Sequence, residues 1–413
     1  MDIMEMLKSV LELNLSGYLE SIGAAPWVIN LIGVLNLATA CMLIVIFLIW
    51  LERKVIARMQ DRIGPNRVGG KYGLLQSVAD ATKLLSKELI TPAGVDWLPY
   101  NLAPILIVVA SLLTWAVIPL APGVIGVDLN IAVFFVLAIS SISVVTFLLA
   151  GWGSNNKYAL LGAFRAVAQM VSYEVPMIVA LLIPILLARS MSTVDIVEAQ
   201  GIPFIIVVPL SALIFFISAL AETGRTPFDL LEADSEIVAG FHIEYSGMKF
   251  AMFFLAEFLG TLFMSAFFVV IYLGGYRFFG LEEAMIGDFH IGPMIGFIAF
   301  ATKVFLVYFV FIWIRATLPR VRIDQLLNFN WKFLVPLSLV LLLTVAVMDK
   351  LFLADASTLT KAVVLMVTNI VVGWITIELL RWRNRDGETA VISESVDDAH
   401  GHNHDAHEAV ATH

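Results

Sequence analysis

Nine strongly apolar segments, each about the length of a membrane-spanning helix, run through this chain of 413 residues. Crossing the hydrocarbon core of a bilayer, which is ~30 Å thick, takes about 20 helical residues. We therefore predict an all-α polytopic membrane protein with about nine transmembrane helices. Their predicted positions are near residues 28–50, 99–120, 131–151, 165–188, 203–222, 249–272, 294–317, 333–353 and 360–381.

The composition supports this class and excludes several kinds of chemistry. Hydrophobic residues make up 60% of the chain and charged residues 14%, which is more apolar than a soluble core needs. The one cysteine, Cys41, lies in the first apolar segment, so the chain has no internal disulfide and no cluster held by its own thiolates. Haem ligation between helices and phosphate-binding glycine motifs are not indicated either. We expect no redox cofactor and no metal on this chain.

The distribution of Lys and Arg predicts the orientation in the membrane. Nineteen of the 25 basic residues fall on one side of the spans, five fall on the other, and Lys303 lies inside a span. Because cytoplasmic loops carry the excess of Lys and Arg, the N-terminus is predicted outside and the C-terminus in the cytoplasm. The predicted organisation is an outside segment over residues 1–27, a transmembrane domain over 28–382 and a cytoplasmic tail over 383–413.

Neither end of the chain carries a strong functional signal. The first twenty residues are mixed and acidic, without the basic start and small-residue cleavage site of a signal peptide. The tail is polar and rich in histidine, a composition that can bind metal. We favour the simpler interpretation of a disordered, solvated tail.

A cytoplasmic loop at residues 222–247 is acidic, against the charge expected on that side of the membrane. Arg225 and Lys249 are the basic residues in and beside it. A series of carboxylates that continues into the next span indicates a site that moves protons or holds cations. Its members are Glu222, Asp229, Glu232, Asp234, Glu236, Glu244 and, within the next span, Glu257.

Three charged residues are predicted near the middle of spans. Glu174 lies nine residues beyond Arg165, or about 13 Å into its span, and Glu257 and Lys303 lie at similar depths. A charge at this depth costs at least ~2.5–3.5 kcal/mol, so such residues face a partner or a watery path. We favour proton transfer; a static Glu–Lys pair is the alternative. Pro176 frees a helical carbonyl and could loosen the helix to admit water.

The first cytoplasmic loop, residues 52–98, combines a shaped turn with an amphipathic segment. Gly64, Pro65 and Asn66 form a tight turn among Arg53, Arg58, Arg62 and Arg67, as expected where a backbone approaches a ligand or partner closely. Apolar residues recur every three or four positions from 72 to 90, which predicts an amphipathic helix at the membrane interface. The alternative for the basic residues is ordinary topology and lipid headgroup binding; for Lys83 and Lys87 we favour it.

These motifs resemble a known family. The segments ERKVIARMQDRIGPNRVG, the step Tyr173-Glu174-Val175-Pro176, and ETGRTPFDLLEADSEIVAGFHIEYSGMKF are similar to the H subunit of bacterial respiratory complex I, called NADH dehydrogenase subunit 1 in mitochondria. The resemblance covers roughly residues 28–382 with the motifs in the family's order. It implies a subunit of a proton-translocating NADH:quinone oxidoreductase in a bacterial inner membrane.

The resemblance also implies roles for individual residues. Arg53, Arg62, Gly64, Pro65, Asn66 and Arg67 would shape a quinone chamber, and Glu222, Glu232, Asp234, Glu236 and Glu244 would begin an acidic path from it. Glu174 and Glu257, with Lys303, would continue the path toward antiporter-like subunits. Quinone would be the substrate, and NADH, FMN and the iron–sulfur clusters would belong to partner subunits of the peripheral arm. Membrane lipid, but no nucleic acid, is an expected partner.

Three other functions fit parts of the sequence. The first is the equivalent subunit of a related ion-pumping complex fed by ferredoxin, a deazaflavin-type donor or hydrogenase chemistry. The second is a stand-alone proton-coupled transporter, for which the sequence shows no second copy of the acidic loop. The third is a membrane scaffold, which three mid-membrane charges disfavour.

Overall fold

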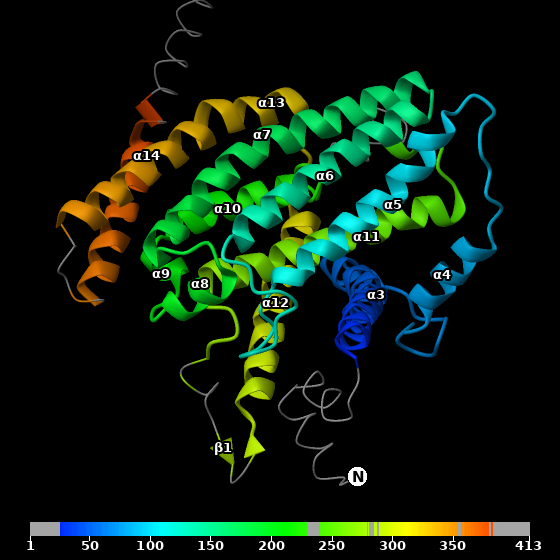
Figure 1. Ribbon diagram of the computed structural model, residues 1–413. Helices are drawn as coiled ribbons and strands as arrows, with labels where there is room; N and C mark the ends of the chain where they lie inside the picture. Colours follow the sequence, from blue (N-terminus) through cyan, green and yellow to red (C-terminus); the bar gives the residue numbers. More distant parts are fainter. Residues whose placement is uncertain are drawn as a thin grey trace, which may run out of the picture.

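The computed structural model describes residues 25–229, 240–278, 280, 285–286, 289–352, 357, 359–379 and 381–382. Apart from one short hairpin with two strands of two residues each, the regular elements in these ranges are helices (Figure 1), which confirms the all-α fold class. The elements are α3 (Pro26–Met59), α4 (Gln76–Ser86), α5 (Trp97–Leu113), η1 (Thr114–Val117), α6 (Ala132–Gly153), α7 (Lys157–Ala188), α8 (Thr193–Ala199), α9 (Phe204–Val207), α10 (Pro209–Glu222), η2 (Gly240–His242), α11 (Gly247–Tyr272), β1 (Met285–Ile286), β2 (Phe289–His290), α12 (Gly292–Thr317), α13 (Ile323–Phe329), the π-helix η4 (Asn330–Leu334), α14 (Val335–Val347) and the π-helix η5 (Met348–Phe352).

Eight helices within the described ranges are long and apolar enough to cross a bilayer. They correspond to eight of the nine predicted spans and include the last one, Leu359–Leu379. α7 has 32 residues and is therefore about 48 Å long, which exceeds the ~30 Å of hydrocarbon, so it must tilt or extend beyond the membrane. α3 also continues beyond its predicted end, to Met59, and carries the first charges of the next loop within the helix.

The fifth predicted span, residues 203–222, is the one that does not form a continuous long helix. It consists of α9, with 4 residues, and α10, with 14. Val208 between them has φ −131° and ψ 63°, outside the helical region. Pro209 explains the break, because a proline ring disfavours helical geometry in the residue before it.

The amphipathic helix is shorter than the predicted 72–90. It begins at Gln76, after Gly73, whose φ of +66° lies outside the right-handed helical region. Gly73 packs closely against Pro65, since a Cβ on it would lie 2.3 Å from the Pro65 carbonyl oxygen. After Ser86 the chain is extended, and the Ile90 amide donates to the Ser246 hydroxyl at 3.0 Å.

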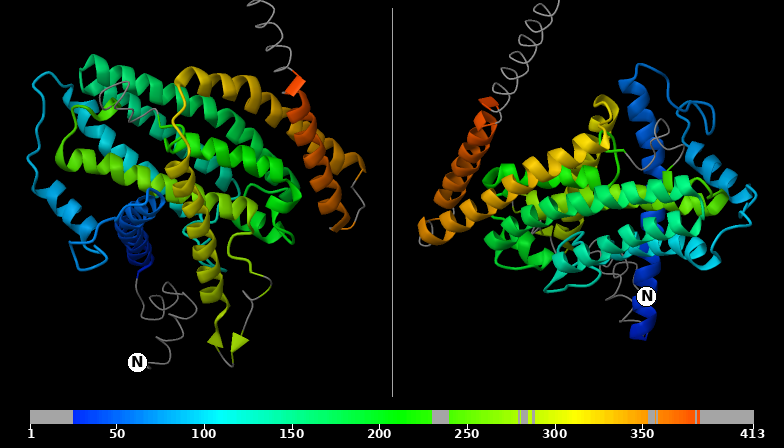
Figure 2. Two further views of the ribbon diagram at one scale, coloured as in Figure 1. Left: turned by 180° about the vertical axis from the view of Figure 1, so that it is seen from behind. Right: turned by 90° about the horizontal axis from the view of Figure 1, so that it is seen from above.

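The long helices form a layer that two others cross. α5, α6, α7 and α11 lie side by side, whereas α3 and α12 cross α11 steeply (Figures 1 and 2). α13 and α14 run along the outer side of α7 (Figure 1). The crossing of α3, α11 and α12 brings together residues that are 263 positions apart in the chain.

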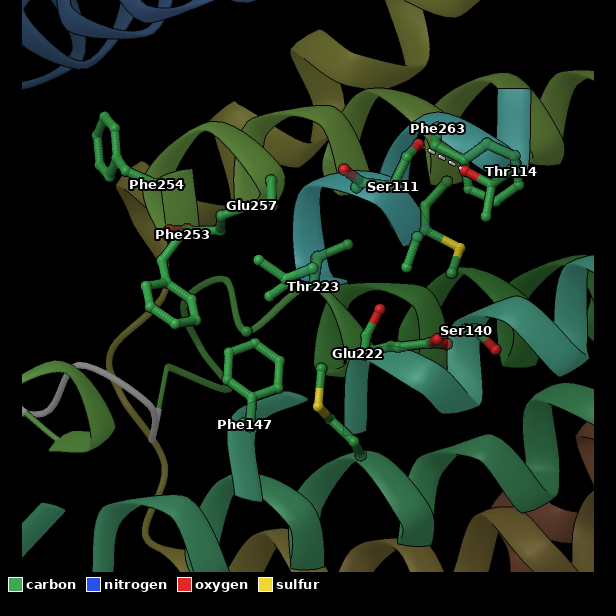
Figure 3. A pocket seen from close by; sticks show the side chains of 18 of the residues that line it. Ser111, Thr114, Ser140, Phe147, Glu222, Thr223, Phe253, Phe254, Glu257 and Phe263 are labelled. Atoms are coloured by element: carbon green, nitrogen blue, oxygen red, sulfur yellow. Dashed lines mark hydrogen bonds between the residues drawn. The ribbon is translucent and has the colours of Figure 1, made fainter. Parts of the chain in front are cut away.

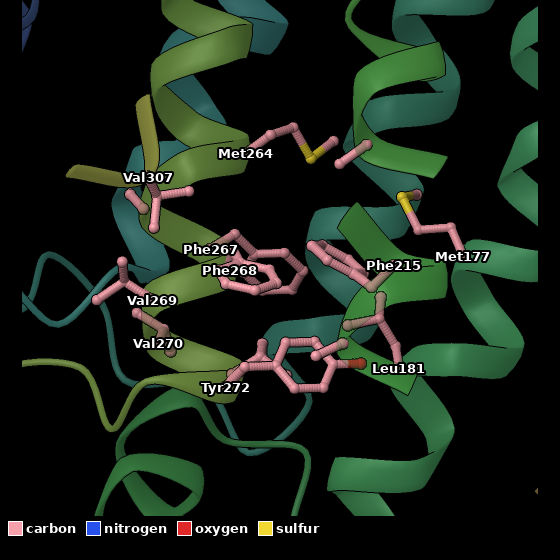
Figure 4. Close-up of a cluster of buried hydrophobic side chains, with 14 of the residues drawn as sticks. Met177, Leu181, Phe215, Met264, Phe267, Phe268, Val269, Val270, Tyr272 and Val307 are labelled. Atoms are coloured by element: carbon pink, nitrogen blue, oxygen red, sulfur yellow. The ribbon is translucent and has the colours of Figure 1, made fainter. Parts of the chain in front are cut away.

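α11 is the central helix of the core. In its most apolar stretch, 78% of the residues are buried, the highest share among the spans of the described chain. The rings of Phe215, Phe268 and Tyr272 gather between α10 and α11 (Figure 4), with centroids 5.7 Å apart for Phe215 and Tyr272 and 6.1 Å for Phe215 and Phe268. Aromatic packing at these distances fixes α10 against α11.

Prolines inside α5 and α7 leave backbone carbonyls that neighbouring side chains satisfy. Because proline has no N–H, the carbonyl four residues before it loses its helical partner. Ahead of Pro104, the Tyr100 carbonyl accepts from the Tyr245 hydroxyl at 3.1 Å. Ahead of Pro184, the Ala180 carbonyl accepts from the hydroxyls of Ser211 and Tyr272, at 2.9 and 3.2 Å.

The third such carbonyl, that of Ser172, lies ahead of Pro176. It accepts from the Asn330 amide at 2.6 Å. The sequence suggested that Pro176 loosens the helix to admit water; the structure instead shows a protein donor at the freed carbonyl. Each internal proline thus ties its helix to a neighbour.

We predict that Gly162→Ala lowers the thermal stability of the detergent-solubilised protein. A Cβ at this position of α7 would lie 2.7 Å from the Gly240 Cα, and forced overpacking costs about 1–3 kcal/mol. Gly33→Ala in α3 is the matched control, because a Cβ there meets no atom within 4 Å. Equal unfolding temperatures for the two variants would contradict the described contact between α7 and η2.

Candidate functional site

A buried cluster of charges lies where α3, α11 and α12 cross. Glu52, in the C-terminal part of α3, is 5% exposed, and Arg225, in the loop after α10, is 3% exposed. One guanidinium nitrogen of Arg225, Nη1, lies 3.0 Å from Oε1 of Glu52, and another, Nε, lies 3.3 Å from Oε1 of Glu257 in α11. Arg225 therefore bridges two carboxylates that come from different helices.

Residues of α11 and α12 complete this cluster. The Arg315 guanidinium also donates to Oε1 of Glu52, and the Tyr308 hydroxyl lies 3.5 Å from its Oε2. The Thr261 hydroxyl oxygen accepts from Nε of Arg225 at 3.3 Å, and the Phe258 ring lies 4.6 Å from the guanidinium carbon. Arginine suits such a site because its planar fork pairs with carboxylates and stacks on aromatic faces.

The cluster balances two carboxylates against two guanidinium groups. Taking one ion out of water costs several kcal/mol, and mutual attraction offsets this only when each charge keeps its partner. The charge of each member therefore influences the other three, and Glu52 pairs with both guanidinium groups. We call Glu52, Arg225, Glu257 and Arg315 the charge cluster.

Gln169 in α7 fastens the loop that carries Arg225. Its amide nitrogen donates to the carbonyls of Ala221 and Phe228, at 2.6 and 2.7 Å, and its side chain is fully buried. The two bonds close residues 221–228 into a fixed turn. Glu222 and Arg225 are consequently held on a rigid base.

A cavity of about 110 Å³ lies beside the charge cluster, between α5, α6, α7 and α11. Glu222 and Glu257 are both in its wall, together with phenylalanine rings, among them Phe147 and Phe253, and hydroxyl side chains (Figure 3). Oε2 of Glu222 is buried and has no hydrogen-bond partner among the described residues. A buried carboxylate oxygen without a partner destabilises the fold unless it is protonated or accepts a hydrogen bond from water.

Glu174 of α7 lies near Glu222, one of the two carboxylates in the cavity wall. Its Oε1 accepts from the Ser141 hydroxyl of α6 at 2.9 Å. It is also close enough to Glu222 for the two charges to interact. Glu222 and Glu257 thus share the cavity wall, and Glu174 interacts with Glu222 from α7.

Glu244 lies just before α11, beside the first residues of α5 and the loop that follows α6. Its Oε1 accepts from the Asn156 amide at 2.7 Å, and its backbone carbonyl accepts from the Tyr100 hydroxyl at 2.8 Å. The Tyr245 ring stacks on Tyr100 at 4.4 Å between centroids. Burial raises the pKa of Tyr245, so its hydroxyl remains a donor to the Tyr100 carbonyl.

Lys303 lies at the opposite end of α11 from this loop. Its ammonium donates to the backbone carbonyls of Leu273, Gly275 and Arg277, at 2.9, 3.0 and 2.6 Å. Sixteen residues separate Glu257 from Leu273, or about 24 Å along the helix axis. The described contacts of Lys303 thus fix the turn after α11.

The first loop folds back on the end of α3. Arg53 pairs with Asp80 of α4, and the Trp50 indole donates to the Tyr72 carbonyl at 3.0 Å. The turn Gly64, Pro65 and Asn66 packs on the last turns of α3, where a Cβ on Gly64 would lie 3.1 Å from the Lys54 side chain. The side chains of Arg62 and Arg67 are exposed next to this turn, with Arg62 donating to Gln60 at 2.8 Å.

The structure gathers some predicted residues and adds others. Glu222 and Glu257 line one cavity, Glu174 lies near Glu222, and the first-loop residues lie together at the end of α3. Glu232, Asp234 and Glu236 lie outside the described residues. Sequence reasoning did not single out Glu52, Tyr308, Arg315 or Gln169. Glu52 could have been found from its place in the motif ERK at the end of the first predicted span. No sequence pattern pointed to Tyr308, Arg315 or Gln169.

The fold and the charge cluster define a polytopic helical membrane protein with paired ionisable groups in its interior, where unpaired charges are costly. The chain belongs to the NADH dehydrogenase family, whose model matches residues 32–346. Similar proteins, each named as the H subunit of NADH-quinone oxidoreductase, include one from Dehalococcoides mccartyi strain CBDB1 (47% identical over 76% of this chain and 85% of that protein). Others come from Geobacillus kaustophilus (48%, over 73% and 88%) and Rickettsia canadensis (46%, over 76% and 91%).

We predict that Arg225→Gln strongly destabilises the protein, because the buried Glu52 and the partly buried Glu257 lose their shared guanidinium. Breaking a buried pair in this way costs about 3–5 kcal/mol. The double variant Glu52→Gln with Arg225→Gln should regain much of this loss, because it restores neutrality. Thermal unfolding in detergent measures both effects.

The control is Arg381→Gln, which breaks the exposed pair of Arg381 with Glu378 at 3.6 Å. Exposed pairs contribute roughly 0–1 kcal/mol, so little should change. Equal destabilisation by Arg225→Gln and Arg381→Gln would refute the role of the charge cluster.

Proposed function

We propose that the chain is the H subunit of an NADH-quinone oxidoreductase, where it links quinone chemistry to proton movement. Support comes from family membership and from the relatives' names. The excess of Lys and Arg in alternate loops supports an N-terminus outside and a C-terminus in the cytoplasm of a bacterial inner membrane. The domain organisation proposed is the predicted one: residues 1–27 outside, 28–382 in the membrane, and a cytoplasmic tail at 383–413.

The observation that carries the proposal is the position of Arg225. It joins Glu52, at the end of α3 from which the first loop emerges, to Glu257, in the wall of the acidic cavity. A negative or positive charge arriving near the first loop would act on Glu52 and, through Arg225, on Glu257. Such a chain of ion pairs gives quinone chemistry an electrostatic route to the cavity carboxylates.

The quinone chamber would be shaped by Arg53, Arg62, Gly64, Pro65, Asn66 and Arg67. The structure supports a built surface here, since Gly73 locks the turn onto Pro65 and Arg53 holds α4 through Asp80. The exposed Arg62 and Arg67 are left to face a partner or ligand. Quinone itself, membrane lipid and the peripheral-arm subunits would meet the chain at this surface.

The proton path would start in the acidic loop with Glu232, Asp234, Glu236 and Glu244 and pass Glu222, Glu257 and Glu174. Protons move between carboxyl groups that share a cavity when water or hydroxyl groups bridge them. Ser111, Thr114 and Ser140 line the same cavity and are such hydroxyl groups (Figure 3). The path would lead toward antiporter-like subunits. The resemblance implied a place on this path for Lys303; we propose instead that Lys303 fixes the turn after α11. NADH, FMN and iron–sulfur clusters would bind to partner subunits.

We predict that Arg67→Ala lowers quinone reductase activity of the assembled complex about tenfold, equivalent to roughly 1.4 kcal/mol. Electron transfer from NADH to a soluble artificial acceptor should change little, because it bypasses the chamber. Lys87→Ala, an exposed basic residue after α4, is the matched control and should leave both activities intact. Equal losses in both assays, with normal assembly, would sink the role of Arg67.

We further predict that Glu222→Gln and Glu257→Gln each depress proton pumping in reconstituted vesicles while the complex still assembles. Glutamine keeps the shape and hydrogen-bonding capacity of the side chain but cannot titrate. Glu378→Gln is the control, because this carboxylate is 57% exposed beside Arg381 near the end of the last helix. Normal quinone-linked turnover with normal pumping in both cavity variants would overturn the relay role.

A further inference from the structure

The helix that carries Glu174 is tied to α13 and η4 at the residues just before this carboxylate. The Ser172 carbonyl, freed by Pro176, accepts from the Asn330 amide at 2.6 Å. The Ser172 hydroxyl accepts from the Trp331 indole at 3.3 Å, and the Tyr173 hydroxyl donates to the Leu326 carbonyl at 3.1 Å. Three hydrogen bonds therefore converge on two consecutive residues of α7.

The bond from Asn330 replaces a backbone bond of the helix. Ser172 lies two residues before Glu174 and Pro176 two residues after it, so the missing helical bond spans the glutamate. A carbonyl left open at this point would turn toward water or let the helix bend. Such bending would change the direction of the Glu174 side chain, whose Oε1 is held by the Ser141 hydroxyl of α6.

We propose that Asn330 is a positioning residue for the proton path, and that it holds Glu174 against α6 by completing the hydrogen bonding of α7. The inference rests on the proposed function of Glu174. It assigns to Asn330 no contact with the moving proton.

The burial of Asn330 shows how specialised this contact is. The residue is fully buried, and its own oxygen, Oδ1, has no hydrogen-bond partner among the described residues. A buried amide with one unmet oxygen adds little to the packing of an apolar interior. Leucine is similar in volume to asparagine, so Asn330→Leu mainly removes the hydrogen bond to the Ser172 carbonyl. Asn330→Leu should consequently leave the fold intact.

The main test is a cycle of two substitutions, measured as quinone-linked turnover and proton pumping in vesicles. Asn330→Leu should lower both about tenfold, equivalent to roughly 1.4 kcal/mol of barrier. Added to Glu174→Gln, it should lower them no further, because a glutamine at this position has no proton to deliver. Non-additivity is the mark of two residues that act through one another. Equal losses in the unaltered protein and in the Glu174→Gln variant would show that Asn330 has only a general structural role and would overturn the inference.

A second variant tests the hydrogen bond itself. Pro176→Ala restores a backbone N–H that can serve the Ser172 carbonyl, so it should rescue Asn330→Leu. If Asn330→Leu alone does not assemble, the double variant decides: assembly with near-normal turnover supports the inference, and failure to assemble overturns it.

The matched control is Ser211→Ala, at the Ala180 carbonyl that Pro184 frees in the same helix, where the Tyr272 hydroxyl remains as donor. It should leave turnover within about twofold, because one donor satisfies the carbonyl; a tenfold loss there would contradict specificity for the Glu174 segment.

The Glu174→Gln variant separates the two proposals. If it alone pumps normally, the proposed role of Glu174 fails, and the positioning role fails with it. If it is impaired while Asn330→Leu pumps normally, only the positioning role fails.

Discussion

The pairing of Arg225 with both Glu52 and Glu257 is the interaction on which the rest of the structure depends. A guanidinium that is 3% exposed needs carboxylate partners, and these come from α3 and α11. Arg315 from α12 also pairs with Glu52, so that two guanidinium groups balance the two carboxylates. The steep crossing of α3 and α12 over α11 is the arrangement that lets all four groups meet. Gln169 then fixes the loop from which Arg225 projects.

This arrangement also explains why the cavity carboxylates lie beside the cluster. Glu257 faces Arg225 on one side and the cavity on the other, and Glu222 shares the same wall. A change in charge near Glu52 therefore alters the balance at Glu257 through a single intervening residue. The phenylalanine rings of the cavity lower the local dielectric, which strengthens that influence. Coupling over this distance needs no large movement of helices.

Much of the fold could be predicted from the sequence, because the length and apolar character of α3, α7 and α11 reflect the thickness of the membrane. Pro209 can be read directly in the sequence, but the break before it was missed because a hydropathy pattern averages over single residues. Glu52 was harder, since α3 continues nine residues past its predicted end, and a charge that looked like the start of a loop is buried in the interior. Tyr308 and Gln169 gave no signal, because their roles come from contacts across the chain. Likewise, Pro176 was evident but its donor, Asn330, was not.

The most direct test of the account is infrared difference spectroscopy of the assembled complex, recorded between oxidised and reduced quinone. If quinone reduction acts on the cavity carboxylates, the spectrum should contain a carbonyl band of a protonated carboxyl group that changes with reduction. That band should disappear or shift in Glu257→Gln and remain in Glu378→Gln. A difference spectrum in the carboxyl region that is the same in the unaltered complex and in Glu257→Gln would contradict the coupling of quinone chemistry to this site.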